Sequence, residues 1–335
     1  MAILVTGGAG YIGSAIVTDL VASGMETIVI DDLSQGHRAA VDPGALFYQG
    51  NCGDAGLLDR IFTTHSITCV IHMAGETVIE ASMRDPYRFF SNNVVAGIAL
   101  LEGMRRHKCG RMIFSSTAAV FGEPETVPIT EDHPKKPINS YGESKLQYEK
   151  ILYWYHRAYG FKFNAFRYFN AAGAHQTYGE DHANETHLIP LVLSAALGQR
   201  DAIHVFGTDY PTRDGSCIRD YVHIRDLSLA HRLALKNLDQ RPARCYNLGN
   251  SEGDTVLEVI EAAKKVTGRD VPAIMEGRRA GDPAVLVASS DLAHKELGWK
   301  PEYPNLEEII MSAWQWHQAH PDGYKNGKDF HPARG

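Results

Sequence analysis

A tyrosine and a lysine four residues apart could together perform proton transfer. Tyr141 and Lys145 belong to the segment YGESK, and residues four apart lie on one face of a helix. A phenol with its usual pKa of about 10 is a poor base at pH 7, and a nearby cation favours the phenolate. We expect Lys145 to lower the pKa of Tyr141, so that the phenolate can remove a proton from a substrate hydroxyl.

A strand-like segment supplies the third candidate catalytic residue, because the apolar run at 112–114 leads into Ser115, Ser116 and Thr117. A hydroxyl at the carboxyl end of such a strand faces the ligand crevice of a parallel sheet. We expect Thr117 to hydrogen-bond the reacting hydroxyl and to orient it. Taken alone, the YxxxK pattern also fits a core tyrosine beside a solvated lysine.

Glycines three apart form a candidate dinucleotide-binding loop. Gly7, Gly10 and Gly13 follow a short apolar run and precede a helical pattern, which is the context that such a loop requires. They would permit a tight turn, a close approach of the backbone to a pyrophosphate, and packing of the helix on the strand. Asp31 ends the next strand and would accept ribose hydroxyls, which favours NAD, although Arg38 leaves NADP open. The alternative is a glycine turn with a structural role only.

Strands alternate with helices over the first half of the chain, which predicts a doubly wound parallel (Rossmann) α/β sheet. After Asn170 this alternation stops, and we expect a smaller C-terminal α/β lobe that binds the substrate. The segment from Arg219 to Leu248 would return one more helix and strand to the first lobe. The expected division is therefore 1–173 plus about 216–249 for the dinucleotide lobe, about 174–215 plus 250–325 for the substrate lobe, and a loose tail at 326–335.

Composition excludes several classes of protein. The 335 residues include 44% hydrophobic and 22% charged residues, as in an ordinary globular protein. The net charge of −7 disfavours binding to nucleic acid. Five cysteines without a CxxC pair suggest reduced thiols and no metal site. Without a long apolar run or an apolar leader, we expect a cytoplasmic protein with no membrane contact.

The TGGAGYIG loop, the SST strand end and YGESK together resemble the extended short-chain dehydrogenase/reductase family. Within it, the chain is similar to the UDP-glucose 4-epimerases from the first strand to about Trp316. The segments that carry this likeness are RYFNAAGAH (167–175), FGTDYPTRDGSCIRDYVHIRDL (206–227), YNLGN (246–250) and RRAGDP (278–283).

The resemblance implies two sets of binding residues. The set that would line NAD is Gly7, Gly10, Tyr11, Ile12, Gly13, Asp31, Ala74, Gly75, Asn92, Tyr141, Lys145 and Tyr168. The set that would hold a UDP-sugar is Thr117, Asn170, Leu188, His204, Phe206, Arg219, Arg279, Asp282 and Leu286. Guanidinium groups suit a diphosphate, and Phe206 could pack against uracil. Taken alone, either arginine would also fit a surface salt bridge.

The implied activity is interconversion of UDP-galactose and UDP-glucose, by inversion at C4 through a 4-keto intermediate. No carboxyl group follows Thr117 directly, which argues against a dehydratase or a decarboxylase. An epimerase of UDP-glucuronate or of a UDP-N-acetylhexosamine is the main alternative, because Leu286 is smaller than tyrosine at the position that limits room beside C2. A free-cofactor dehydrogenase and a non-catalytic NAD-sensing scaffold are further alternatives.

Some positions depart from the family pattern. Thr77 stands where many of these epimerases have a lysine that contacts the cofactor. Asn51 and Cys52 replace a more usual pair beside the adenine, and Thr186 and His187 replace an asparagine pair near the uracil.

The helix expected over 143–159 carries more aromatic residues than one buried face needs. They are Tyr148, Tyr153, Trp154, Tyr155 and Tyr159. Relatives dimerise through this helix and the one near 94–106, so we expect a homodimer.

Overall fold

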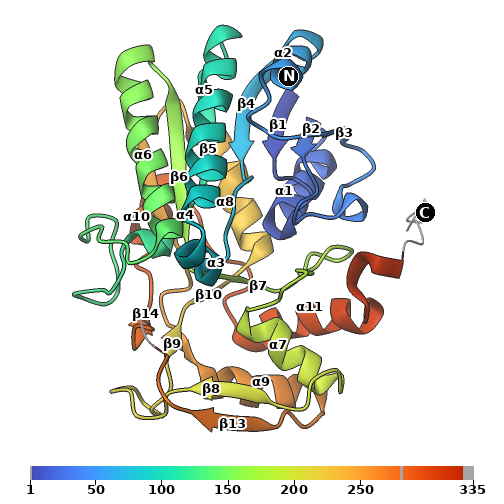
Figure 1. Ribbon diagram of the computed structural model, residues 1–335, viewed down its shortest axis with the longest axis vertical. Helices are drawn as coiled ribbons and strands as arrows, with labels where there is room; N and C mark the ends of the chain where they lie inside the picture. The colour runs from blue at the N-terminus through green and yellow to red at the C-terminus, as the bar shows by residue number, and fades with distance from the viewer. Residues whose placement is uncertain (1, 280–281, 327–335) are drawn as a thin grey trace.

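The computed structural model describes residues 2–279 and 282–326. Its centre is a seven-stranded parallel sheet with the order β11-β6-β5-β4-β1-β2-β3 (Figure 1). The strands are β1 (Ala2–Thr6), β2 (Glu26–Asp31), β3 (Leu46–Gln49), β4 (Ile67–His72), β5 (Arg111–Thr117), β6 (Lys162–Tyr168) and β11 (Arg244–Leu248). The expected doubly wound parallel sheet is confirmed, and the late strand β11 pairs with β6 at its edge.

Helices cover both faces of this sheet because its strands are apolar on both sides. In β1, Ile3 and Val5 pack in a core with α1 (Tyr11–Ala22), α8 (Ile224–Asn237) and α10 (Asp291–Leu297). Ala2 and Leu4 point to the opposite core, which contains α2 (Ala55–Thr64), α5 (Ala96–Arg106) and α6 (Ser140–Tyr159). Alternate residues of one strand therefore hold two helical layers.

The three longer helices below the sheet form a third apolar core (Figure 1). Val192, Val259 and Ile310 meet in it from α7 (Leu188–Ala196), α9 (Val256–Thr267) and α11 (Leu306–Ala319). The short strands there are β7 (Asn170–Ala172), β8 (Ile203–Phe206), β9 (Ile218–Arg219), β10 (Tyr221–His223), β12 (Asp254–Thr255), β13 (Ala273–Glu276) and β14 (Val285–Leu286).

Short helical segments complete the chain. They are η1 (Arg38–Ala40), α3 (Ile79–Arg84), α4 (Pro86–Phe90), the π-helical turn η2 (Ser91–Val95), η3 (Ala118–Val120) and η4 (Gly323–Asn326). The rest of the predicted tail, 327–335, lies outside the described residues. None of the helices in the described ranges has the length and apolar character needed to cross a membrane.

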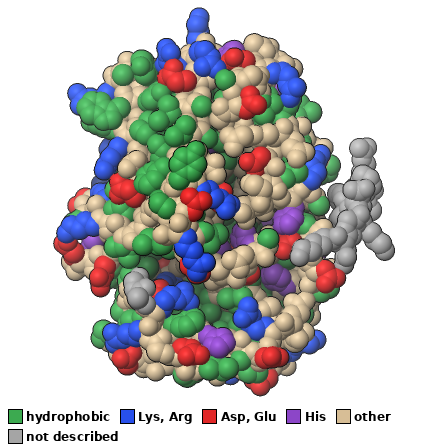
Figure 2. Space-filling model, viewed as in Figure 1, with side chains coloured by type: hydrophobic (Ala, Val, Ile, Leu, Met, Phe, Trp, Pro, Cys, Tyr) green, Lys and Arg blue, Asp and Glu red, His purple; other side chains and the backbone are tan. Residues whose placement is uncertain are grey.

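The outer face of α6 is aromatic. Tyr153, Trp154 and Tyr159 are exposed, and Figure 2 shows a hydrophobic area over α5 and α6. Tyr148 of the same helix is fully buried and donates a 3.0 Å hydrogen bond to the Gly97 carbonyl. Tyr148 fills the core between α5 and the sheet, and the other three aromatic side chains are left on the surface.

The order of the strands places a crevice at the carboxyl end of β1. β2 and β3 lie on one side of β1, and β4 and β5 lie on the other, all parallel to it. Successive crossovers therefore leave β1 in opposite directions, and a gap opens between the loops at this topological switch point.

Candidate active site

A large cavity of about 1510 Å³ opens at the carboxyl ends of the parallel strands. This volume exceeds that of an ordinary small-molecule pocket and suits a dinucleotide together with a second nucleotide. The cavity wall includes every site residue predicted from the sequence except Lys145: Gly7, Gly10, Tyr11, Ile12, Gly13, Asp31, Ala74, Gly75, Asn92, Thr117, Tyr141, Tyr168, Asn170, Leu188, His204, Phe206, Arg219, Arg279, Asp282 and Leu286. Residues that are up to 279 positions apart in the chain thus share one space.

The glycine loop leaves no room for side chains at two of its positions. Gly7 has a φ of +71°, and a Cβ there would lie 2.5 Å from the Ala74 nitrogen. A Cβ on Gly13 would lie 2.1 Å from the Gly7 oxygen, where α1 packs on the loop. Gly10 precedes α1 without a capping side chain in the described structure, which leaves N–H groups of the first turn for a phosphate.

Asp31 lies at the end of β2 with both carboxylate oxygens facing the glycine loop and the turn that follows β2. One oxygen accepts a hydrogen bond from the Ala9 N–H and the other from the Leu33 N–H, each 2.9 Å long. Burial raises the pKa of Asp31, and these two backbone hydrogen bonds act in the opposite direction. With the tight loop and the open helix terminus, this fixed carboxylate fits NAD.

Tyr141 lies in the first turn of α6, which begins where the Asn139 side chain accepts a hydrogen bond from the Gly142 N–H. Burial raises the pKa of Tyr141, while its hydrogen bond with Thr117 lowers it. These shifts describe the protein without its cofactor, and the expectation that Lys145 and the charge of the nicotinamide together favour the phenolate stays a prediction. The described chain keeps the phenol protonated near neutral pH.

Lys145 lies one turn further along α6, behind the cavity surface. Only 2% of Lys145 is exposed, and its Nζ donates a 2.9 Å hydrogen bond to the Ser115 carbonyl. Burial lowers the pKa of Lys145 to about 8. None of the ion pairs found among the described residues involves it. Gly75 lies above the ammonium and has no side chain. A Cβ at this position would crowd Nζ, because it would lie only 3.2 Å away.

Glu76, in the loop after β4, makes contacts that the sequence did not reveal. The buried carboxylate of Glu76 accepts hydrogen bonds from the Arg88 guanidinium at 2.8 Å and from the Asn92 amide at 3.2 Å. Glu76 thereby fixes the amide of Asn92 at the cavity wall.

At the far end of the cavity, two arginines share one carboxylate. The Arg219 guanidinium lies 3.3 Å from the Asp282 carboxylate, and Nε of Arg279 lies 3.9 Å from it. Arg279 also covers the ring of Phe206, with its guanidinium carbon 4.3 Å from the ring centre. Two guanidinium groups and one carboxylate leave a local charge of +1, which suits an anionic ligand beside an aromatic ring.

The other predicted substrate residues surround this end of the cavity. His204 pairs with Glu276 at 3.0 Å, and the Asn170 amide donates to the Asp220 carbonyl at 3.2 Å. Leu286 packs against the small core that contains Val120. It therefore belongs both to the cavity wall and to the packing beneath it.

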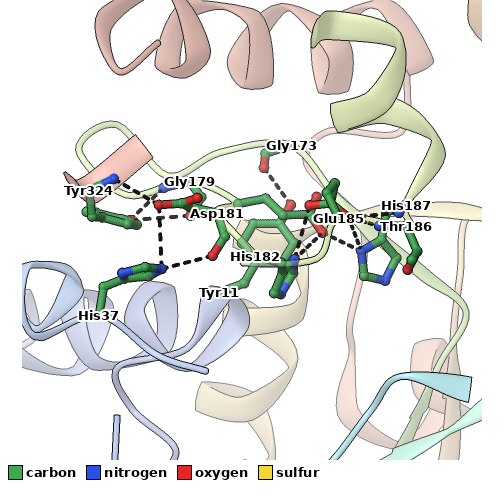
Figure 3. A network of polar contacts seen from close by, with 11 residues as sticks. Tyr11, His37, Gly173, Gly179, Asp181, His182, Glu185, Thr186, His187 and Tyr324 are labelled. Atoms are coloured by element: carbon green, nitrogen blue, oxygen red, sulfur yellow. Dashed lines mark hydrogen bonds and ion pairs between the residues drawn. The ribbon is translucent and has the colours of Figure 1, made fainter. Parts of the chain in front are cut away.

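The loop before α7 contributes polar residues that the sequence analysis did not single out as a group. Glu180, His182, Glu185 and His187 line the cavity and form mutual ion pairs. Figure 3 shows the side chains of His182, Glu185 and His187 gathered in front of Tyr11. The alternation of histidine and glutamate in residues 180–187 is the signal that could have indicated this cluster.

Comparisons with known proteins agree with the geometry. Residues 3–249 match the model of the NAD dependent epimerase/dehydratase family. A UDP-glucose 4-epimerase of Lacticaseibacillus casei is 49% identical over 97% of this chain and 99% of its own length. A crystal structure of a UDP-glucose 4-epimerase superposes with a TM-score of 0.95 at 49% identity, covering 97% of this chain and 99% of that one. The enzyme from Bifidobacterium longum, solved with NAD+ and UDP, gives 0.91 at 36% identity, covering 96% and 100%. The chain therefore belongs to the NAD dependent epimerase/dehydratase family.

Proposed function

We propose that this protein is a UDP-glucose 4-epimerase, an isomerase that interconverts UDP-galactose and UDP-glucose by inverting C4 of the sugar. The observation that carries the proposal is that one cavity joins the glycine loop, the Tyr141–Thr117 pair and the two arginines beside Phe206. The extensive identity with UDP-glucose 4-epimerases supports the same activity rather than the alternatives with other UDP-sugars.

The residues around the switch point would hold NAD. The first turn of α1 would bind its diphosphate, Asp31 its adenosine ribose, and Lys145 would donate to the cofactor from behind Tyr141. When bound, NAD would supply reversible hydride transfer at C4 of the sugar.

Tyr141 would act as the base and then as the acid. Its phenolate removes the proton of the 4′-hydroxyl, and Thr117 orients that hydroxyl. Because burial raises the pKa of Tyr141, the phenolate needs the positive charge of Lys145 and of the oxidised cofactor together. The phenol then returns the proton to the 4-keto oxygen, so that the cycle ends with the base restored.

Inversion requires that the sugar turn over while its nucleotide stays bound. Arg219 and Arg279 would bind the diphosphate, and Phe206 would pack against the uracil. These contacts with the diphosphate and the uracil would lie remote from the reacting carbon. Their binding energy is available to hold the intermediate in the cavity. The sugar itself then keeps the freedom to present either face.

Two further properties belong to this proposal. The exposed aromatic face of α6, with Val95 and Ile98 beside it, supports a homodimer through α5 and α6. All five cysteines are free thiols, which supports a reducing, cytoplasmic location. The dinucleotide half would comprise 1–173 with about 216–249, and the UDP-sugar half about 174–215 with 250–325.

The test is a substrate panel with purified protein. UDP-galactose, UDP-glucuronate and UDP-N-acetylgalactosamine are each incubated with and without added NAD, and products are separated by chromatography. The proposal predicts the fastest conversion for UDP-galactose. Faster conversion of another sugar would move the assignment to that sugar, and steady accumulation of NADH would instead indicate a dehydrogenase.

A further inference from the structure

The most concentrated set of metal-binding side chains in the described chain lies in the loop before α7. Glu180, His182, Glu185 and His187 each offer one donor atom, and these four atoms all lie within 4.8 Å of one another. All four residues come from one eight-residue segment. We propose that this loop binds one divalent transition-metal ion, of the Zn²⁺ or Co²⁺ type, at a site separate from the proton-transfer residues.

The distances from each imidazole to the two carboxylates are close to those in a tetrahedral site, with a different oxygen of Glu185 facing each ring. Both imidazoles present Nδ1 to the cluster. Nδ1 of His187 lies 2.9 Å from a carboxylate oxygen of Glu180 and 2.9 Å from one of Glu185. Nδ1 of His182 lies 3.5 Å and 3.1 Å from oxygens of the same two residues. Tetrahedral ligands bound about 2.0 Å from Zn²⁺ lie about 3.3 Å apart, so an ion could enter with small side-chain shifts.

The charge and chemistry of the donors select the class of ion. An ion that displaces the protons shared in these ion pairs leaves two carboxylates and two neutral imidazoles, which balance a charge of +2, and the Glu180 carboxylate is buried with only 5% exposed. Imidazole nitrogen favours Zn²⁺, Co²⁺ or Ni²⁺, whereas Mg²⁺ and Ca²⁺ prefer oxygen donors. Glu185 is already held in place, because its carboxylate accepts hydrogen bonds from the N–H groups of Thr186 and His187 at 2.8 and 2.7 Å.

The position of the cluster gives the ion a structural role. The ring of His182 meets the ring of Tyr11 edge-on, with centroids 6.3 Å apart, and the Tyr11 hydroxyl donates to the Gly173 carbonyl at 2.6 Å (Figure 3). An ion at the cluster would therefore fix the conformation of the loop before α7 where His182 packs against Tyr11. It would stabilise one wall of the cavity without touching Tyr141.

The experiment is a Co²⁺ titration of protein freed of metal by a chelator. We expect one Co²⁺ per chain, the intense visible absorption of four-coordinate Co²⁺, its loss on addition of Zn²⁺, and a higher melting temperature with either ion. His187→Gln and Glu185→Gln should each weaken binding by at least about tenfold. The control His107→Gln alters a similar pair with Asp59, at 2.8 Å between α2 and α5, and should leave binding unchanged.

Binding is measured on the protein itself, so the result does not depend on the epimerase activity. Glutamine keeps a hydrogen-bonding group at each position, and circular dichroism checks that the variants are folded. The absence of a stoichiometric Co²⁺ spectrum would overturn the proposal. Equal affinity in His187→Gln, Glu185→Gln and the parent would overturn it as well, and either result would leave the cluster as ion pairs only.

Discussion

The Lys145 ammonium donates a 2.9 Å hydrogen bond to the Ser115 carbonyl, so a buried cation is held at the carboxyl end of β5. The bond fixes where this cation can act, because Ser115 lies two residues before Thr117 on the same strand. The cation therefore lies behind the proton-transfer pair. Burial of this charge destabilises the folded protein when no cofactor is bound.

The destabilisation by the buried Lys145 ammonium should appear in the pH dependence of stability. Burial lowers the pKa of Lys145 from 10.5 to about 8, so the unfolded chain holds more protons than the folded chain between these values. Stability from this group therefore rises as the pH rises above 8. The free energy of unfolding of the cofactor-free protein is measured in urea at pH 7 and at pH 9.5. Between these pH values it should rise by about 2 kcal/mol more in the parent than in Lys145→Met. Parallel curves would contradict this, and Lys150→Met, at an exposed position of the same helix, is the control.

Asp31 should determine both affinity for NAD and discrimination against NADP. Asp31→Asn keeps one acceptor for the loop but removes the charge, so we expect about 10- to 100-fold weaker NAD binding and a smaller preference over NADP. Calorimetry or cofactor fluorescence measures the dissociation constants for NAD and for NADP. Asp32→Asn changes the neighbouring exposed carboxylate and should have little effect. Unaltered NAD affinity in Asp31→Asn would exclude the proposed ribose contact.

Arg279 should act on binding of the nucleotide rather than on the chemical step. Arg279→Gln removes a guanidinium that lines the cavity beside Phe206, and we expect KM to rise about 10- to 100-fold with kcat nearly unchanged. The adjacent Arg278 pairs with Asp209 outside the cavity wall, so Arg278→Gln is the matched control. A fall in kcat with constant KM would contradict the assignment.

The aromatic face of α6 should be the dimer contact. Trp154 is 62% exposed, and Trp154→Glu would place a charge in the middle of the proposed interface. Light scattering at micromolar concentration should give a dimer mass for the parent and a monomer mass for this variant. Met275→Glu changes an exposed apolar residue on β13 and should remain dimeric. A monomeric parent, or a dimeric Trp154→Glu, would show that this face is not the contact.

Local sequence patterns predicted the parts of the site that depend on backbone conformation. Gly7 and Gly13 are required by contacts within one strand-loop-helix unit, and Asp31 ends the next strand, so spacing alone located them. Tyr141 could likewise be placed from its position in a helix after the strand that ends at Thr117.

Properties that depend on packing between distant elements could not be predicted in this way. The direction of the pKa shift of Tyr141 follows from burial, which spacing does not report. The sequence did not show which aromatic residues of α6 are buried, because an aromatic residue in a helix does not reveal which neighbour covers it; Tyr148 is the buried one. The link from Glu76 to Arg88 and Asn92 needs the path of an irregular loop.

The central claim is that one cavity oxidises C4 of a UDP-sugar and returns the same hydride to it. The direct measurement mixes UDP-galactose carrying deuterium at C4 with UDP-galactose carrying a ¹³C-labelled sugar, and analyses the UDP-glucose formed by mass spectrometry. We predict that deuterium stays at C4 of the molecules that carried it, and that Tyr141→Phe forms almost no product. Deuterium lost to water, deuterium found in the ¹³C-labelled molecules, or undiminished conversion by Tyr141→Phe would contradict the account.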